Sequence, residues 1–449
     1  MEYFLVICSY LCLFLFFSVF IWKQSPAESK YVVTGVRLLV AFLVFRCSIA
    51  YFSYDTDIIS RVKALTALGV AFIGLSVAQY GIAKIYISPG IYLQEGKDDI
   101  GGRKFLFLVA LMFVVAVVLF QGIPAGFYFW NILGSSEMSA LRREISKSYL
   151  FGGSEYRGQG VFRTVIEVMG AFLFSFSVLA FFKSKQKLKK ALYALSSVIV
   201  SLILISEGSR GMLMNAIVAA VCSYVYVNPK VKIRKIFLSC FAVLAIFFAS
   251  SLITSKSMAL RDGAISFSDF SSTLFERLFM ANAINDIYIF EIEPNENIKP
   301  GPMYWLARDI KASIPGMSAG KPLAYELYYY KTGDLKGTTY LTGTHMMKAY
   351  MDGGYVSVFF QYFAIGLVVC FIDKLVYRKI ILPKSKNKTF YYAVAGSLAL
   401  FSGLSFITGL IGTLINLAVL FLVVWLGVGT GKLFHTLFKS RRNETSLSF

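Results

Sequence analysis

Residues 191–227 read ALYALSSVIVSLILISEGSRGMLMNAIVAAVCSYVYV, two apolar runs separated only by SEGSRG at 206–211. An α-helix rises about 1.5 Å per residue and the hydrocarbon core of a bilayer is about 30 Å thick, so each run is almost long enough to cross it once. The stretch therefore predicts two antiparallel membrane helices, with Glu207 and Arg210 in the turn between them.

Apolar blocks of similar length recur along the whole chain. Of its 449 residues 57% are hydrophobic and 16% charged, whereas a soluble protein carries roughly a quarter charged residues. The blocks predict an all-α polytopic membrane protein with about eleven transmembrane helices. The expected helices are 3–22, 32–52, 64–83, 105–127, 163–182, 191–206, 212–227, 236–255, 355–373, 389–408 and 411–430.

Basic residues gather in the short segments between these blocks, for example KSKQKLKK at 183–190 and NPKVKIRK at 228–235. Such segments are typical of cytoplasmic loops. The N-terminus is then expected outside and the C-terminus inside. The net charge of +20 comes mainly from these loops. We therefore expect this protein to contact the lipid bilayer and not nucleic acid.

This orientation divides the chain into three parts. Residues 1–255 are expected to hold helices 1–8, with an outer loop at about 128–162. Residues 256–354 form a large, partly helical outer loop. Residues 355–449 hold the last three helices and a basic cytoplasmic tail.

The turn at 206–211 is the first candidate site. Glu207 and Arg210 are expected at the outer membrane interface, where an ionisable pair is costly and suggests function. A guanidinium there suits a bidentate phosphate contact without a metal, which points to a lipid-linked diphosphate. The alternative is a purely structural turn, in which Arg210 pairs with Glu207 and extends towards water.

The outer loops carry further candidates. Arg142 and Arg143 precede the glycine-rich stretch GGSEYRGQG at 152–160, which suits an anionic or sugar ligand; a helical surface patch is the alternative. Tyr329 belongs to an aromatic run that suits sugar stacking or membrane anchoring equally. Three arginines of the long loop are reserve candidates for substrate binding: Arg261, Arg277 and Arg308.

His345 is one of only two histidines, and it stands in TGTHMMKAYMDGGY just before the helix expected from 355. An imidazole held near the outer interface could act as a general base on a sugar hydroxyl. A structural histidine is the alternative. A metal-dependent mechanism would instead use Asp55 and Asp57 of YDTD, a spacing that can bind a divalent ion with a diphosphate.

Three motifs of the sequence belong together: the GSRG turn at 208–211, IPGMSAGKP at 314–322 in one large outer loop, and THMMKAYMDGGYVSVFFQYFAIGL at 344–367. In combination they resemble the O-antigen polymerase family, the oligosaccharide repeat-unit polymerases of bacterial envelopes. Arg142 followed by Gly158 fits an arginine–glycine spacing of some members. The O-antigen ligases share this architecture.

The resemblance implies a GT-C-like glycosyltransferase of the bacterial inner membrane, with its active site facing the periplasm and with neither metal nor cofactor. Donor and acceptor would be undecaprenyl-diphosphate-linked oligosaccharides, and a chain-length regulator is an implied partner. Arg210 would bind one diphosphate, Arg142 and Arg143 the other, and His345 would be the acceptor base. The alternatives are an O-antigen ligase-like transferase, a flippase or exporter of lipid-linked oligosaccharides, a structural membrane protein and the metal-dependent transferase.

Overall fold

The computed structural model describes residues 33–53, 57–85, 102–121, 159–205, 210–228, 284–292, 301–314, 343–381 and 389–444, together with the single positions 11, 266, 268, 317, 323, 326, 327 and 329. Helices dominate this part of the chain, and it contains no strand. The prediction of an all-α fold is confirmed for the described residues.

Nine of the expected apolar helices have a counterpart in the structure. They are α2 (Gly35–Ser53), α3 (Ile58–Ala83), α4 (Gly102–Gln121), α6 (Gln159–Lys183), α7 (Lys187–Ile205), α8 (Arg210–Val227), α15 (His345–Leu375), α16 (Thr389–Gly403) and α17 (Ser405–Glu444). The large outer loop contributes α12 (Ile284–Ile292) and α13 (Tyr304–Ser313), and a π-helix, η4 (Val376–Ile381), follows α15. The expected helices 3–22 and 236–255 fall outside the described ranges, apart from Leu11.

Four helices among the described residues are long and apolar enough to cross a membrane: Ile58–Ala83, Arg163–Lys183, His345–Ile381 and Ser405–Leu426. The exposed side of α17 carries Phe421 and Trp425, whose exposed fractions are 72% and 60%. Large apolar side chains left outside the core on a long helix fit contact with lipid. These helices indicate a membrane protein; the full number of crossings and their orientation stay predictions.

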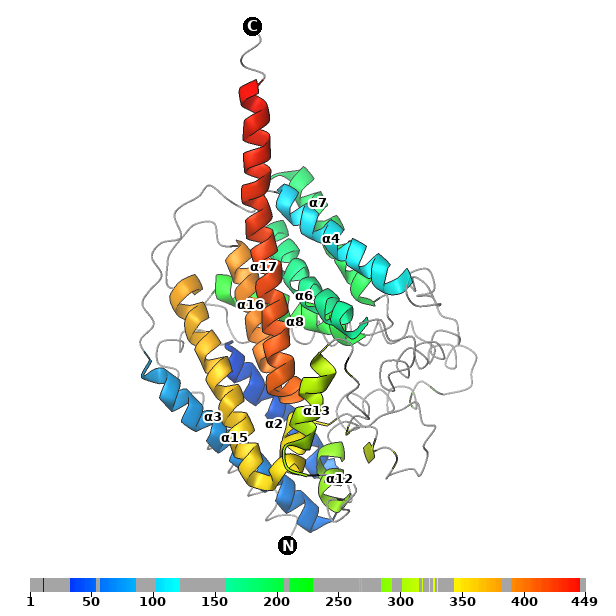
Figure 1. Cartoon of the computed structure of the whole chain (residues 1–449), viewed down its shortest axis with the longest axis vertical. Coiled ribbons are helices and arrows are strands. Elements are labelled where there is room, and N and C mark those ends of the chain that lie inside the picture. Colours follow the sequence, from blue (N-terminus) through cyan, green and yellow to red (C-terminus); the bar gives the residue numbers. More distant parts are fainter. Residues whose placement is uncertain are drawn as a thin grey trace.

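The helices form two packed groups (Figure 1). In one group α15 lies along α3, with α2 beside them and α12 and α13 at one end. In the other, α6 packs against α4, α7, α8 and α16. The long helix α17 contacts members of both groups, and α16 joins them by packing on α2 as well as on α8.

Glycines bring α3 and α15 into close contact. A Cβ atom at Gly74 would lie 2.7 Å from the backbone oxygen of Phe359, and one at Gly366 would lie 2.7 Å from the Cβ of Ala78. Small residues that let helix backbones approach are typical of packing within membranes, where the hydrophobic effect does not drive helices together.

Two adjacent side chains at the end of α15 hold the ends of two other helices. Asp373 accepts hydrogen bonds from the backbone N–H groups of Gly35, at 2.7 Å, and Val36, at 2.9 Å. Lys374 donates from Nζ to two carbonyl oxygens in the last turn of α3, at 2.7 and 2.9 Å. A negative charge at a helix start and a positive charge at a helix end both satisfy unpaired backbone groups and match the helix dipole.

Glycines interrupt α15 and α17. Gly354 has φ 65° and ψ −153°, a conformation that glycine alone adopts readily, and together with Gly353 it separates residues 345–352 from the long part of α15. That long part corresponds to the helix expected at 355–373. Gly409 breaks α17 near its start, with φ 67° and ψ −170°. The two breaks bring polar side chains together at one end of the molecule.

Candidate functional site

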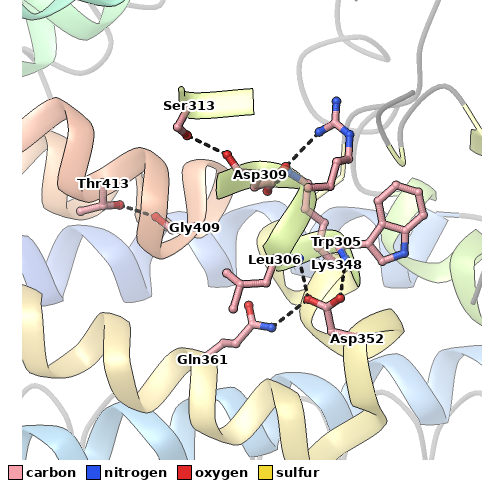
Figure 2. Close-up of polar contacts among 10 residues, drawn as sticks. Trp305, Leu306, Asp309, Ser313, Lys348, Asp352, Gln361, Gly409 and Thr413 are labelled. Carbon is pink, nitrogen blue, oxygen red and sulfur yellow. Dashed lines mark hydrogen bonds and ion pairs between the residues drawn. The ribbon is translucent and has the colours of Figure 1, made fainter. Parts of the chain in front are cut away.

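A polar cluster lies where α13, residues 345–352 of α15 and the Gly409 break of α17 meet (Figure 2). Asp352, the last residue before the break in α15, is its centre. Its carboxylate accepts the backbone N–H groups of Trp305 at 2.7 Å and Leu306 at 3.1 Å, and the side-chain N–H of Gln361 at 3.1 Å. Asp352 therefore satisfies the open N–H groups at the start of α13.

The hydrogen bonds of Gln361 fix the orientation of its amide. Its Nε2 donates to Asp352 and also to Ser357 Oγ at 3.0 Å. An ionised carboxylate only accepts hydrogen bonds, so the nitrogen must be the amide atom that faces it. The other amide atom, Oε1, is buried and has no hydrogen-bond partner among the described residues.

His345 is the first residue of α15, and only 3% of it is exposed. Neither ring nitrogen has a hydrogen-bond partner within the described part of the chain. The ring lies against Gly409, where any Cβ atom would collide with it, and the ring centroid of Tyr362 is 6.2 Å away. The imidazole is thus enclosed by packing without being held by hydrogen bonds.

Charged side chains flank this imidazole. Lys348 and Asp309 act on it electrostatically, and Gln361 is its neighbour as a hydrogen-bonding side chain. Lys348 forms an ion pair with Asp309 at 2.8 Å, and Arg308 pairs with the second oxygen of the same carboxylate at 3.0 Å. The two cations share one carboxylate at the partly exposed edge of the cluster, and the buried carboxylate of Asp352 balances the charge of the cluster as a whole.

Asp286 of α12 fixes the start of α15. Its Oδ1 accepts the backbone N–H of Thr344 at 2.6 Å and the Thr344 hydroxyl at 3.0 Å. Asp286 is fully buried, and the apolar residues of α12 pack into the core that α3 and α15 share. The position of His345 is therefore set from outside its own helix.

The structure joins two of the predicted site residues. His345 and Arg308 belong to one cluster, because Lys348 and Asp309 connect α15 to α13. Tyr329 is a half-buried helical residue. Arg210 is the first residue of α8, so the predicted turn lies between α7 and α8 as expected. Five predicted residues lie outside the described ranges, and their roles stay predictions: Glu207, Arg142, Arg143, Arg261 and Arg277.

Asp57 of the alternative metal site has a structural part. Its Oδ2 accepts the backbone N–H of Ser60 at 3.3 Å and so caps the first turn of α3. Asp55 is not among the described positions. Capping occupies part of the Asp57 carboxylate, which explains an aspartate here without a metal.

Sequence reasoning missed Asp352, Gln361, Lys348 and Asp286. A signal for the first was present, because an aspartate directly before two glycines at the start of an apolar run marks a helix break with a carboxylate beside it. Gln361 stands inside an apolar run, where a single polar side chain indicates a buried hydrogen-bond partner. Nothing local in the sequence marks Asp286.

Comparisons of the chain with protein-family models, with curated proteins and with solved structures found no match. The resemblance to O-antigen polymerases thus rests on the sequence motifs alone. The chemistry of the polar cluster has to support any function independently of them.

Proposed function

We propose that this protein is a glycosyltransferase of the bacterial inner membrane that polymerises undecaprenyl-diphosphate-linked oligosaccharide repeat units on the periplasmic side. One observation carries the proposal: His345 keeps both ring nitrogens buried and without a hydrogen bond among the described residues, beside the ion pairs of Lys348 and Arg308 with Asp309. A buried polar group without a partner costs about 1–3 kcal/mol, so its presence calls for an explanation in function.

A neutral imidazole offers one nitrogen that can accept a proton. In the proposed reaction the hydroxyl of the acceptor sugar gives its proton to His345. The oxygen of that hydroxyl forms a bond to the anomeric carbon of the donor. At the same time the bond between that carbon and the diphosphate oxygen breaks, and its electron pair leaves with undecaprenyl diphosphate. The imidazolium then passes its proton to the leaving diphosphate or to water.

Cationic side chains would stabilise the charge of the leaving diphosphate, because fixed guanidinium groups act strongly where water is partly excluded. Arg210 is proposed for one diphosphate, oriented by Glu207, and Arg142 with Arg143 for the other. Arg308 is paired with Asp309, one of the side chains that act on His345. Arg261, Arg277 and Tyr329 are proposed to bind the remainder of the substrates. The scheme needs neither a metal nor a cofactor.

The burial of His345 requires a local opening before an acceptor hydroxyl can reach it. The glycine breaks at Gly354 and Gly409 flank the cluster, and glycine absorbs backbone rotation at little cost. A movement of α13 away from residues 345–352 is proposed to expose the imidazole.

Reconstitution of the full chain in liposomes with lipid-linked repeat units tests the proposal. Long glycans that form with a chelator present, with undecaprenyl diphosphate released, would support it. Loss of chain growth on chelation would favour a metal-dependent transferase, and transfer only to an acceptor without a polyprenyl diphosphate would favour a ligase. Repeat units that cross the bilayer without growing would identify a flippase. His435→Ala in the C-terminal tail is the matched control for His345→Ala.

A further inference from the structure

We infer that Gln361 is the positioning residue of His345: its Oε1 accepts the imidazole N–H and leaves the other ring nitrogen free to take a proton. The inference rests on the proposed function, in which His345 is the base. It adds a residue that neither the sequence motifs nor the proposed chemistry had assigned.

The first step concerns which atoms of the Gln361 amide already have hydrogen-bond partners. Asp352 and Ser357 together occupy Nε2 at 3.1 and 3.0 Å. The oxygen Oε1 is therefore turned to the opposite side of the amide. It is buried without a partner among the described residues, so it needs a donor.

The second step is to ask which neighbour can serve the imidazole. Lys348 carries only donors, and its Nζ is paired with Asp309. Asp309 is already shared between Lys348 and Arg308. Of the three polar side chains that act on the ring, Gln361 is the one with a buried acceptor atom that has no partner at all among the described residues.

The contact is not a formed hydrogen bond in this structure, since both ring nitrogens and Oε1 lack partners among the described residues. The inference is that a small shift of the two side chains closes this hydrogen bond in the protein at rest, before any substrate binds. The ring packs directly against the bare backbone of Gly409, where a Cβ atom would collide with it.

The arrangement is a chain from carboxylate to amide to imidazole: Asp352 orients Gln361, and Gln361 orients His345. A carboxylate in place of the amide would stabilise the imidazolium strongly by its charge. A neutral amide selects the tautomer and adds little to the stability of the charged form, so the proton can leave again. This suits a base that must be regenerated after every transfer.

Nitrogen-15 NMR of histidine tests the inference directly. In a His435→Gln background His345 is the only histidine, so its two ring signals can be assigned without ambiguity. In the full chain in lipid nanodiscs without substrate, we expect one protonated and one bare nitrogen with a single tautomer dominant. Gln361→Leu should reduce this preference about fivefold, the factor that one typical neutral hydrogen bond supplies.

Asn215→Leu is the matched control. It also removes an amide, one that donates to Glu167 at 2.7 Å between α8 and α6, and it should leave the His345 signals unchanged. If Gln361→Leu fails to fold, Ser357→Ala replaces it: one amide N–H is released, and the tautomer preference should fall in the same direction by a smaller factor.

The inference is overturned if the wild-type ring populates both tautomers equally, if the Gln361 and Ser357 variants keep the wild-type spectrum, or if Asn215→Leu changes it as much. Because the spectrum needs no substrate, an inactive wild-type protein with the expected spectrum would refute the proposed function and leave the pairing intact. If both hold, Gln361→Leu should lower kcat about tenfold or more with KM almost unchanged.

Discussion

Asp352 caps a helix to which it does not belong: its Oδ1 accepts the backbone N–H of Trp305 at 2.7 Å, although 47 residues separate the two in the chain. At the N-cap position of α13 stands Met303, whose backbone is left-handed with φ 59° and whose side chain makes no capping bond. The carboxylate at the α15 break replaces the missing cap, so α13 and the Gly353–Gly354 break depend on each other.

Asp352→Ala should therefore destabilise the protein by about 2 kcal/mol, because it leaves buried N–H groups of α13 and of Gln361 without an acceptor. The measurement is the apparent melting temperature in detergent, together with proteolysis within residues 304–313. Asp309→Ala is the control. Its carboxylate is partly exposed, and ion pairs of that kind are typically worth under about 1 kcal/mol. An equal loss of stability in both variants would contradict the role of Asp352 as the N-terminal cap of α13.

His345→Leu should leave stability unchanged or raise it, because the ring nitrogens it removes make no hydrogen bonds among the described residues. Chain growth should disappear in the same variant. The two measurements are thermal unfolding and polymer length in the reconstituted system. A marked drop in melting temperature would instead identify His345 as a structural residue.

Gly409→Ala should displace the imidazole, since its Cβ would collide with the ring. Its backbone conformation, with φ 67° and ψ −170°, also disfavours alanine by about 1–3 kcal/mol. We expect at least a tenfold loss of chain growth, accompanied by a change in the nitrogen-15 signals of His345. Gly81→Ala is the control, because it lies within α3 and a Cβ there meets nothing within 4 Å. It should be neutral or stabilising, and unchanged activity in Gly409→Ala would argue against His345 as the base.

Arg210→Ala should abolish chain growth while the protein remains folded and inserted, because the guanidinium is the proposed ligand of a diphosphate. Arg378→Ala in η4, at the end of α15 predicted to face the cytoplasm, is the control. Near-normal glycan lengths in Arg210→Ala would mean that the turn at 206–211 only connects two helices.

The positions of most apolar helices could be predicted because their signal is local. The turn at 206–211 is a good example, since α7 ends at Ile205 and α8 begins at Arg210. The start of α15 could not be predicted in the same way. His345 begins this helix ten residues before the apolar run, because Asp286, distant in sequence, holds Thr344. The two successive glycines mark a helix boundary, and the structure does place a separate short helical segment, 345–352, before them.

In the candidate site, too, some residues have a local sequence signal and others depend on contacts with distant residues. His345 could be singled out from its rarity and its place before an apolar run, and Arg308 from its charge in the outer loop. The role of Gln361 follows only from its hydrogen bond to Asp352 and from its position near the imidazole. Both depend on the backbone conformation at Gly354. Pairings of that kind belong to the tertiary structure and leave no mark in one sequence.

The neighbours Asp373 and Lys374 place opposite charges on opposite helix ends, the carboxylate at the start of α2 and the ammonium at the end of α3. If α15 shifted its register by one residue, one of the two charges would take the place of the other and meet a helix end of its own sign. The other charge would lose its partner, so one contact would become repulsive and the other would be lost. The smooth apolar surfaces of membrane helices allow many sliding positions of similar energy, and this pair of charges selects one of them.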